Sequence, residues 1–555
     1  MSPLRCSRAA RPSLTLHRAP LALLAASLFT ASSPLFVACS SADSGVNDSS
    51  SSVASTSHSQ TGESGEGDDT SKQESAGGES TGNASASAGD EGSTSGAEPG
   101  GTSPDAPEPE PGVDDLLESE TPLVPGCDLE HPLQLQLRTL DAGAASSPAQ
   151  ARDAALGGWV SLTGIGIRAW EFLNYYTFDY PAAAQPGAVV ITPGLAQDAD
   201  GYTLQVGIRT HNLAAEARPS VHLTLALDNS GSMQGKAQDL VRITGEAIAA
   251  SLREGDIVSI VTWNSTDQVV LDAHPVSGPA DETLLAKLDA LEVGGSADLY
   301  SGLVGAYKLA EATYDETAWN RVILISDGGA SVNESDLEVI ANHPKISLTG
   351  VGVGDPGIYR SDLMDAVAHA GRGSSLFIGS ESEATRQFVD RFIPILGTAV
   401  RDVLVHVQLP PGFELIRDDD SGVLAGDSLT GPNVRLGPGR AFVVHRRFRS
   451  CADQVDIGAK LTVKVQYVDE QTGSDKETWA TANLGQLLAE DSGALRKGAA
   501  IHAYAHLLTQ WQARPVDLAE ALTDVLTRLE AAQKLLPNDP ELAEISAVLA
   551  VLGAE

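Results

Sequence analysis

The sequence predicts an α/β fold: a doubly wound domain inserted between two β-rich flanks and followed by a helical C-terminal region. Three patterns lead to this expectation. Short apolar runs alternate with amphipathic runs over residues 220–397, which is typical of a mostly parallel sheet covered by helices. On either side of this segment, apolar and polar residues alternate with period two, as in half-buried strands. From residue 483 onward the pattern is helical and punctuated by prolines.

The α/β segment divides into regularly spaced elements. The apolar runs that predict strands cover residues 223–227, 257–261, 322–325, 346–353 and 376–378. The amphipathic runs that predict helices cover residues 238–252, 282–291, 299–312, 336–341 and 362–370, with a last one after residue 381. Because the strand candidates are apolar nearly throughout, we expect them to be buried on both faces.

The two flanks cover residues 126–219 and 398–482. Residues 133–137 and 202–206 in the first flank and 461–467 in the second alternate cleanly. The densest aromatic cluster of the chain lies at residues 168–181, and we interpret it as buried packing with polar tips rather than as a ligand-stacking surface. Residues 483–555 predict about four helices, separated by proline-containing turns.

The N-terminal 125 residues have two parts. Residues 1–39 have the pattern of an export signal, in which arginines precede a short apolar run that ends at Cys39. This ending resembles the lipobox of bacterial lipoproteins, which implies a lipid anchor on Cys39 in the bacterial envelope, with the outer membrane as the expected site. An ordinary signal peptide with an incidental cysteine is the alternative. Residues 40–125 carry 18 Asp and Glu against one Lys, which predicts a disordered, self-repelling tether.

Charge and cysteine content narrow the function classes. A net charge of −38 argues against a protein that grips nucleic-acid phosphates. Apart from the signal, the chain has two cysteines, Cys127 and Cys451, and in an oxidising compartment they predict one disulfide. Since these cysteines flank the α/β domain, their pairing would join both flanks into one composite β domain. The sequence has no CxxC and no Cys/His cluster, so we do not expect a zinc site.

Oxygen-bearing side chains follow two of the predicted strands. Asp228, Ser230 and Ser232 are spaced two residues apart in a turn after the first strand, and Asp327 follows a later strand before two glycines. Open α/β sheets bind ligands at the carboxyl ends of their strands. Carboxylate and hydroxyl ligands suit Mg²⁺, or else Mn²⁺ or Ca²⁺. A helix N-cap would account for the serines alone, but the second acid favours a divalent-cation site.

These motifs resemble the von Willebrand factor type A (VWA) domain. Asp228, Ser230 and Ser232 match the first part of its metal-ion-dependent adhesion site (MIDAS), and Asp327 matches the later acid. The aromatic cluster at residues 168–181 is similar to the element that precedes the VWA domain in bacterial YfbK-like lipoproteins, which also end in a β segment and helices. The resemblance therefore implies a VWA fold with a cation held at these positions.

One loop departs from the VWA pattern. Where the family usually has Gly-Gly-Ser-Thr-Asp-Leu, this sequence has Ala297 in place of the threonine, directly after Ser296. A hydroxyl of the third loop is therefore missing unless Ser296 shifts by one residue. In the family this threonine contacts the cation mainly when a ligand's acid is bound, so Ala297 bears on both cation affinity and ligand binding.

The favoured interpretation is a non-enzymatic binding module. The resemblance implies that an envelope-tethered VWA domain uses its cation to accept an exposed carboxylate of a protein partner. Two alternatives stay open. An exported hydrolase would use the cation as a Lewis acid, but it needs a general base near Asp228, and the sequence shows none. An accessory subunit of a chelatase or AAA-type ATPase is the other; those subunits are cytoplasmic, so a cleaved export signal would exclude it.

Overall fold

The computed structural model describes residues 128–139, 145–158, 162, 164–199, 201–416, 423–424, 435–451, 454–513 and 518–553. The predicted export signal with Cys39, the predicted tether and Cys127 lie outside the described residues. Among the helices that are described, none combines the length and apolar character needed to cross a membrane.

Strands and helices alternate through most of the α/β segment, whereas the second flank is a run of strands and the C-terminal region is a run of helices. The strands are β1 (Leu133–Thr139), β2 (Val189–Asp198), β3 (Gly201–Thr210), β4 (Val221–Asp228), β5 (Ile257–Trp263), β6 (Asp267–Pro275), β7 (Trp319–Ser326), β8 (Ser347–Val353), β9 (Arg372–Ile378), β10 (Val400–Leu409), β11 (Phe413–Leu415), β12 (Val423–Leu424), β13 (Ala441–Ser450), β14 (Lys460–Asp469) and β15 (Asp475–Asn483). The helices are α1 (Ser146–Leu156), α2 (Ala169–Tyr175), α3 (Lys236–Ser251), α4 (Glu282–Asp289), α5 (Leu299–Ala312), α6 (Glu334–Ala341), α7 (Ser361–Ala370), α8 (Glu381–Thr385), α9 (Phe392–Leu396), α10 (Leu484–Ala489), α11 (Gly493–Ala513), α12 (Ala519–Leu535) and α13 (Pro540–Leu552).

The α/β domain is built on one sheet. In the part of the chain that the structure describes, its strand order is β6-β5-β4-β7-β8-β9. All neighbours are parallel except β5 and β6, which are antiparallel. This arrangement confirms the predicted doubly wound sheet and each of its predicted strands. Strand β6 was not predicted from the sequence, because its apolar run is limited to residues 269–271 and most of its side chains are exposed at the edge of the sheet.

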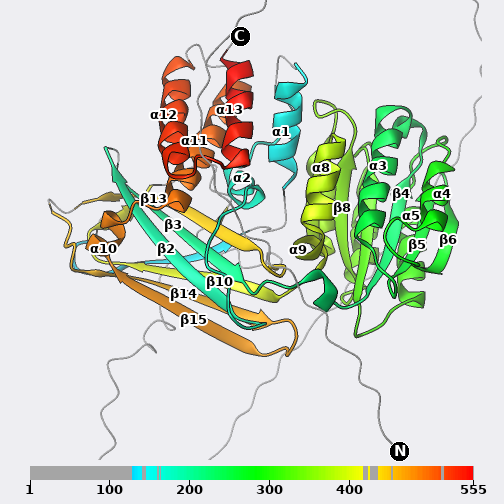
Figure 1. The fold of residues 1–555 in the computed structure, drawn as a ribbon, viewed down its shortest axis with the longest axis horizontal. Helices are drawn as coiled ribbons and strands as arrows, with labels where there is room; N and C mark the ends of the chain where they lie inside the picture. Colours follow the sequence, from blue (N-terminus) through cyan, green and yellow to red (C-terminus); the bar gives the residue numbers. More distant parts are fainter. Residues whose placement is uncertain are drawn as a thin grey trace, which may run out of the picture. The chain divides into compact units, whose positions relative to one another are not determined.

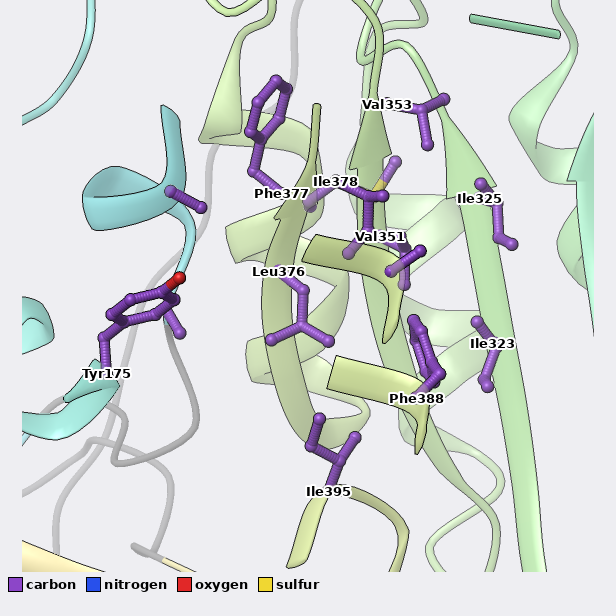
Figure 2. Packing of buried hydrophobic residues seen from close by; sticks show 14 of the residues in the cluster. Tyr175, Ile323, Ile325, Val351, Val353, Leu376, Phe377, Ile378, Phe388 and Ile395 are labelled. Atoms are coloured by element: carbon purple, nitrogen blue, oxygen red, sulfur yellow. The ribbon is translucent and has the colours of Figure 1, made fainter. Parts of the chain in front are cut away.

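The middle of the sheet is buried on both faces. The central strands β4, β7 and β8 consist almost entirely of buried residues. Figure 2 shows part of this core, in which Ile323 and Ile325 of β7, Val351 and Val353 of β8 and Leu376 of β9 belong to one apolar cluster. This packing fixes the strands rigidly, and with them the loops at their carboxyl ends.

The two flanks together form a β domain. Among the described residues, one sheet has the order β12-β1-β10-β14-β15 and the other the order β11-β13-β3-β2. Each sheet thus contains strands from before and after the α/β domain. Apolar side chains of both sheets share one cluster, which includes Leu137, Val206, Val405, Phe442 and Val463. The structure confirms the composite β domain expected from joining the flanks.

Cys451 follows β13 and is disulfide-bonded. Its backbone N–H donates to the Gly412 carbonyl at 2.8 Å, and the Gly412 N–H donates to the Asp128 carbonyl at 2.7 Å. Gly412 therefore links Cys451 to the residue that follows Cys127 in sequence. Because Cys127 itself lies outside the described residues, its pairing with Cys451 stays a prediction.

The first flank contains helices that its description as β-rich did not include. Helix α1 is rich in Ala and Ser, with Leu156 as its one large aliphatic residue, so no amphipathic pattern marks it, although most of its side chains are buried. Helix α2 lies in the aromatic cluster. Phe172, Tyr175 and Tyr180 are at most 6% exposed, and Figure 2 shows Tyr175 on the cyan segment beside the β9 side of the core. The cluster therefore packs as interpreted.

The C-terminal region is helical, as predicted. It consists, over its described residues, of α10 to α13. Asp539 caps α13 by accepting hydrogen bonds from the N–H groups of Glu541 and Leu542, and Pro540 occupies the first turn, where its missing N–H is tolerated. Helix α1 packs beside α13 (Figure 1) and against β9. The first flank and the C-terminal helices therefore meet beside β9, the edge strand of the α/β sheet opposite β6.

Candidate metal centre

Two adjacent strands bring the predicted acids to one edge of the sheet. Asp228 is the last residue of β4, and Asp327 directly follows β7. These strands are parallel neighbours, with Leu227 paired with Ile325. Both acids therefore lie where the carboxyl ends of the two strands meet. The negative charge of Asp327 raises the pKa of Asp228, as expected for two acids that lie close together.

Asp228 is a buried carboxylate, only 3% exposed. Its Oδ1 accepts a hydrogen bond from the Ser230 N–H at 2.9 Å, and its Oδ2 accepts one from the Ser326 hydroxyl at 2.7 Å. Burial raises the pKa of Asp228, the bonds from Ser326 and Ser230 work against that rise, and the charge of Asp327 adds to it. A bound cation would lower the pKa of Asp228 again, because it stabilises the ionised carboxylate.

The two serines of the first loop face each other. The hydroxyl oxygens of Ser230 and Ser232 are 3.1 Å apart; Ser230 is buried, whereas Ser232 is exposed. The turn that carries them is fixed at both ends, since the Gly231 N–H donates to the Gly295 carbonyl at 3.0 Å and Met233 is fully buried. The loop therefore presents neutral oxygen atoms next to the Asp228 carboxylate.

Asp327 sits at the start of a tight turn. Its Oδ1 accepts a hydrogen bond from the Gly329 N–H at 2.9 Å. Gly328 has a φ of 78°, a conformation that is strained for other residues, and a Cβ there would lie 2.6 Å from the Arg360 carbonyl oxygen. The backbone path thus requires Gly328, and this turn places the half-buried Asp327 carboxylate at the carboxyl end of the sheet.

In the third predicted loop, the side chain of Ser296 contacts Ser265, which follows β5. The hydroxyl oxygens of Ser296 and Ser265 are 3.0 Å apart, and the Ser296 N–H donates to the Ser265 hydroxyl oxygen at 3.3 Å. Ala297 is exposed, and Asp298 caps α5 by accepting from the Ser301 N–H at 3.3 Å. A one-residue shift that placed Ser296 at the threonine position would break its contacts with Ser265.

Two serines near the site, Ser326 and Ser265, were not predicted from the sequence. Ser326 holds the Asp228 carboxylate, and Ser265 contacts the third loop. Both follow the pattern used for the other residues: each lies at the carboxyl end of a buried strand, β7 or β5. Ser326 could have been predicted from the sequence, because it ends an apolar run and directly precedes Asp327.

The side chains present fit a hard divalent cation. Asp228, Asp327, Ser230 and Ser232 offer oxygen atoms only, as Mg²⁺, Mn²⁺ and Ca²⁺ prefer. Within the described residues, no group of three or more His, Cys, Asp or Glu could hold a metal ion. Cation binding at this edge would therefore rely on the serine hydroxyls in addition to the two acids.

Comparison with known proteins identifies the domain that carries this site. Residues 223–330 match the family model for the von Willebrand factor type A domain. This part of the chain is a VWA domain. The matched segment runs from β4 to the turn after Asp327, so it includes every residue predicted for the MIDAS. VWA domains commonly mediate protein interactions, and many bind a divalent cation at a MIDAS.

The relatives named here carry no assigned activity. "Uncharacterized protein YfbK" of Escherichia coli (strain K12) is 26% identical over 264 residues, which are 44% of this chain and 45% of YfbK. "Uncharacterized protein sll0103" of Synechocystis is 24% identical over 205 residues, 36% of this chain and 47% of that protein. The chain thus spans about half the length of the curated relatives it matches. A solved VWA structure from Catenulispora acidiphila matches with a TM-score of 0.40 and 14% identity, over 66% of this chain and 91% of that one.

Proposed function

We propose that this protein is an exported, lipid-anchored binding module that holds a protein partner through a divalent cation at its MIDAS. The observation that carries the proposal is the convergence of Asp228, Asp327, Ser230 and Ser232 at the carboxyl edge of the VWA sheet. Mg²⁺ is the expected ion, with Mn²⁺ or Ca²⁺ as substitutes. The proposed role is binding rather than catalysis, because the sequence offers no candidate general base near Asp228.

Each side chain has a distinct part in the proposed site. Asp228 and Asp327 supply the negative charge that holds the ion, while Ser230 and Ser232 supply neutral oxygen atoms. Ser326 orients the Asp228 carboxylate by its 2.7 Å hydrogen bond. A bound divalent cation supplies an electrophilic centre at which a carboxylate oxygen of the partner completes the ligand shell. Ala297 leaves one position of that shell to water, so we expect weak but measurable affinity for the ion.

The proposed location follows from the N-terminal 125 residues. Export would be followed by lipidation of Cys39, and residues 40–125 would hold the folded part away from the membrane. The like charges of that tract repel one another and extend it. The VWA domain would then meet partners in the envelope, where a partner's exposed Asp or Glu is the expected contact.

A capture experiment with matched variants tests this function. The full chain is immobilised and exposed to envelope extract in Mg²⁺ or in chelator, alongside Asp228→Asn and Asp281→Asn. Asp281 is a suitable control, since it is also buried, at 4% exposure, but it caps α4. We expect the same partner with the wild type and Asp281→Asn in Mg²⁺, and its loss in chelator and with Asp228→Asn. Retention of that partner in chelator would contradict the proposal.

A further inference from the structure

Helix α1 lies outside the matched VWA segment, yet it contacts a loop beside the candidate metal centre. Gln150 of α1 is 2% exposed. Its amide Nε2 donates to the Pro356 carbonyl at 2.5 Å and to the Tyr359 carbonyl at 3.1 Å. One side chain thus holds both ends of the short loop that follows β8, across about 200 residues of sequence.

The opposite side of this loop packs on the Asp327 turn. A Cβ on Gly328 would lie 2.6 Å from the Arg360 carbonyl oxygen and 3.3 Å from the Tyr359 ring, so both residues press directly on the residue after Asp327. The loop also contacts the helix that follows the first metal loop, because Lys236 Nζ lies 3.2 Å from Asp355 Oδ1. The loop therefore separates Gln150 from the candidate ligands by a single packed layer.

Helix α1 is itself held firmly, so Gln150 is a fixed point. The Arg152 guanidinium lies 3.1 Å from Glu383 of α8 and 3.6 Å from Glu544 of α13. The Ser147 N–H donates to the buried Glu171 carboxylate at 2.9 Å. Figure 1 shows α1 beside α13 and close to α8. The buried charges tie α1 to the VWA domain and to the C-terminal helices together.

We propose that Gln150 is a positioning residue for the metal centre: it fixes the loop over residues 355–360, which in turn fixes the Asp327 turn. This proposal rests on the proposed cation site. Removal of the amide would leave the buried Pro356 and Tyr359 carbonyls without this hydrogen-bond donor. The loop would then relax away from Gly328. The Asp327 carboxylate would then lose its fixed orientation, although no ligand atom had been changed. The VWA domain would thus depend on a helix from the N-terminal flank.

Magnesium titration of matched glutamine variants tests the proposal. Gln150→Met keeps the length of the side chain and removes its donor. Gln512→Met is the control, because Gln512 also donates its amide to two backbone carbonyls, those of Ile165 at 2.8 Å and Leu162 at 3.4 Å. With the full chain and Mg²⁺ alone in a titration calorimeter, we expect Gln150→Met to weaken binding roughly three- to tenfold, about the range of one net hydrogen bond, and Gln512→Met to leave it unchanged.

A second measurement separates positioning from general loss of stability. Hydrogen exchange without cation should become faster at the Gly328 and Gly329 amides in Gln150→Met, because these amides bond to Ser326 and Asp327; the control should not change them. If the wild type binds no Mg²⁺, the proposed function fails. If the wild type binds Mg²⁺ and Gln150→Met binds it equally well, the positioning role alone is refuted.

Discussion

Replacing Asp228 with asparagine removes the charge of the carboxylate that we propose as the central ligand and keeps the shape of the side chain. In the metal-free protein, burial raises the pKa of Asp228 and the charge of Asp327 raises it further. The folded state therefore binds this proton more tightly than the unfolded chain does. The stability linked to this group is present at low pH and is lost as the pH rises from the ordinary pKa through the raised one. At pH 7 the variant escapes that loss, so without cation it should unfold at a higher temperature than the wild type.

Addition of Mg²⁺ should reverse this order. A ligand at 100 times its dissociation constant stabilises the folded state by about 2.7 kcal/mol. For a domain of about 180 residues, each kcal/mol raises the unfolding midpoint by about 2–4 °C, so the wild type should gain about 5–11 °C. Asp228→Asn should gain almost nothing, because the buried carboxylate that the ion needs is gone.

Differential scanning calorimetry over a Mg²⁺ series, with chelator as the zero point, measures both effects. Asp281→Asn serves as the control. Asp281 accepts hydrogen bonds from Ser277, Thr283 and Leu284, so its variant should start at a lower midpoint and keep the full Mg²⁺ response. An equal Mg²⁺ response in Asp228→Asn and the wild type would refute the assignment of Asp228 as a ligand.

Three further predictions concern other parts of the chain. Ala297→Thr should tighten Mg²⁺ binding by about 1 kcal/mol, roughly fivefold, as one added polar contact would; unchanged affinity in calorimetric titration would mean that position 297 does not face the ion. Intact-mass measurement of membrane-extracted protein should show a diacyl or triacyl addition on Cys39, and a water-soluble product with another N-terminus would contradict this. Peptide mapping after alkylation should find Cys127 joined to Cys451, with about 4–5 kcal/mol of stabilisation from closing so long a loop; free thiols before reduction would exclude the pair.

The fold was predictable where burial leaves a pattern in the sequence. Strands β4, β7 and β8 are buried along nearly their whole length and contain apolar runs, so these strands are visible in the sequence without any knowledge of their neighbours. Strand β6 and helix α1 were not predictable. The first is exposed at a sheet edge, and the second buries Ala, Ser, Gln and Arg whose partners lie far away in sequence. Its Arg152, for example, meets Glu544 of α13.

The candidate site was also predictable only in part, namely for the residues at the ends of apolar strands. Asp228 and Asp327 stand at the ends of apolar strands, and parallel pairing brings such ends together. The contact between Ser296 and Ser265 could not be predicted, because it depends on how the loop that carries Ser265 folds beside Ser296. The role of Gln150 could not be predicted either. A glutamine in an unpatterned helix carries no local signal, and its two acceptors are set by the tertiary fold.

The most direct test of the central claim is the position of a bound ion. Crystals of the protein grown with saturating Mn²⁺ would be measured at the manganese absorption edge, where anomalous scattering marks the metal. We predict a peak at the carboxyl ends of β4 and β7, within bonding distance of oxygen atoms of Asp228, Asp327, Ser230 and Ser232. An anomalous map with no peak there, or with a peak only at other residues, would contradict a cation-dependent VWA site in this protein.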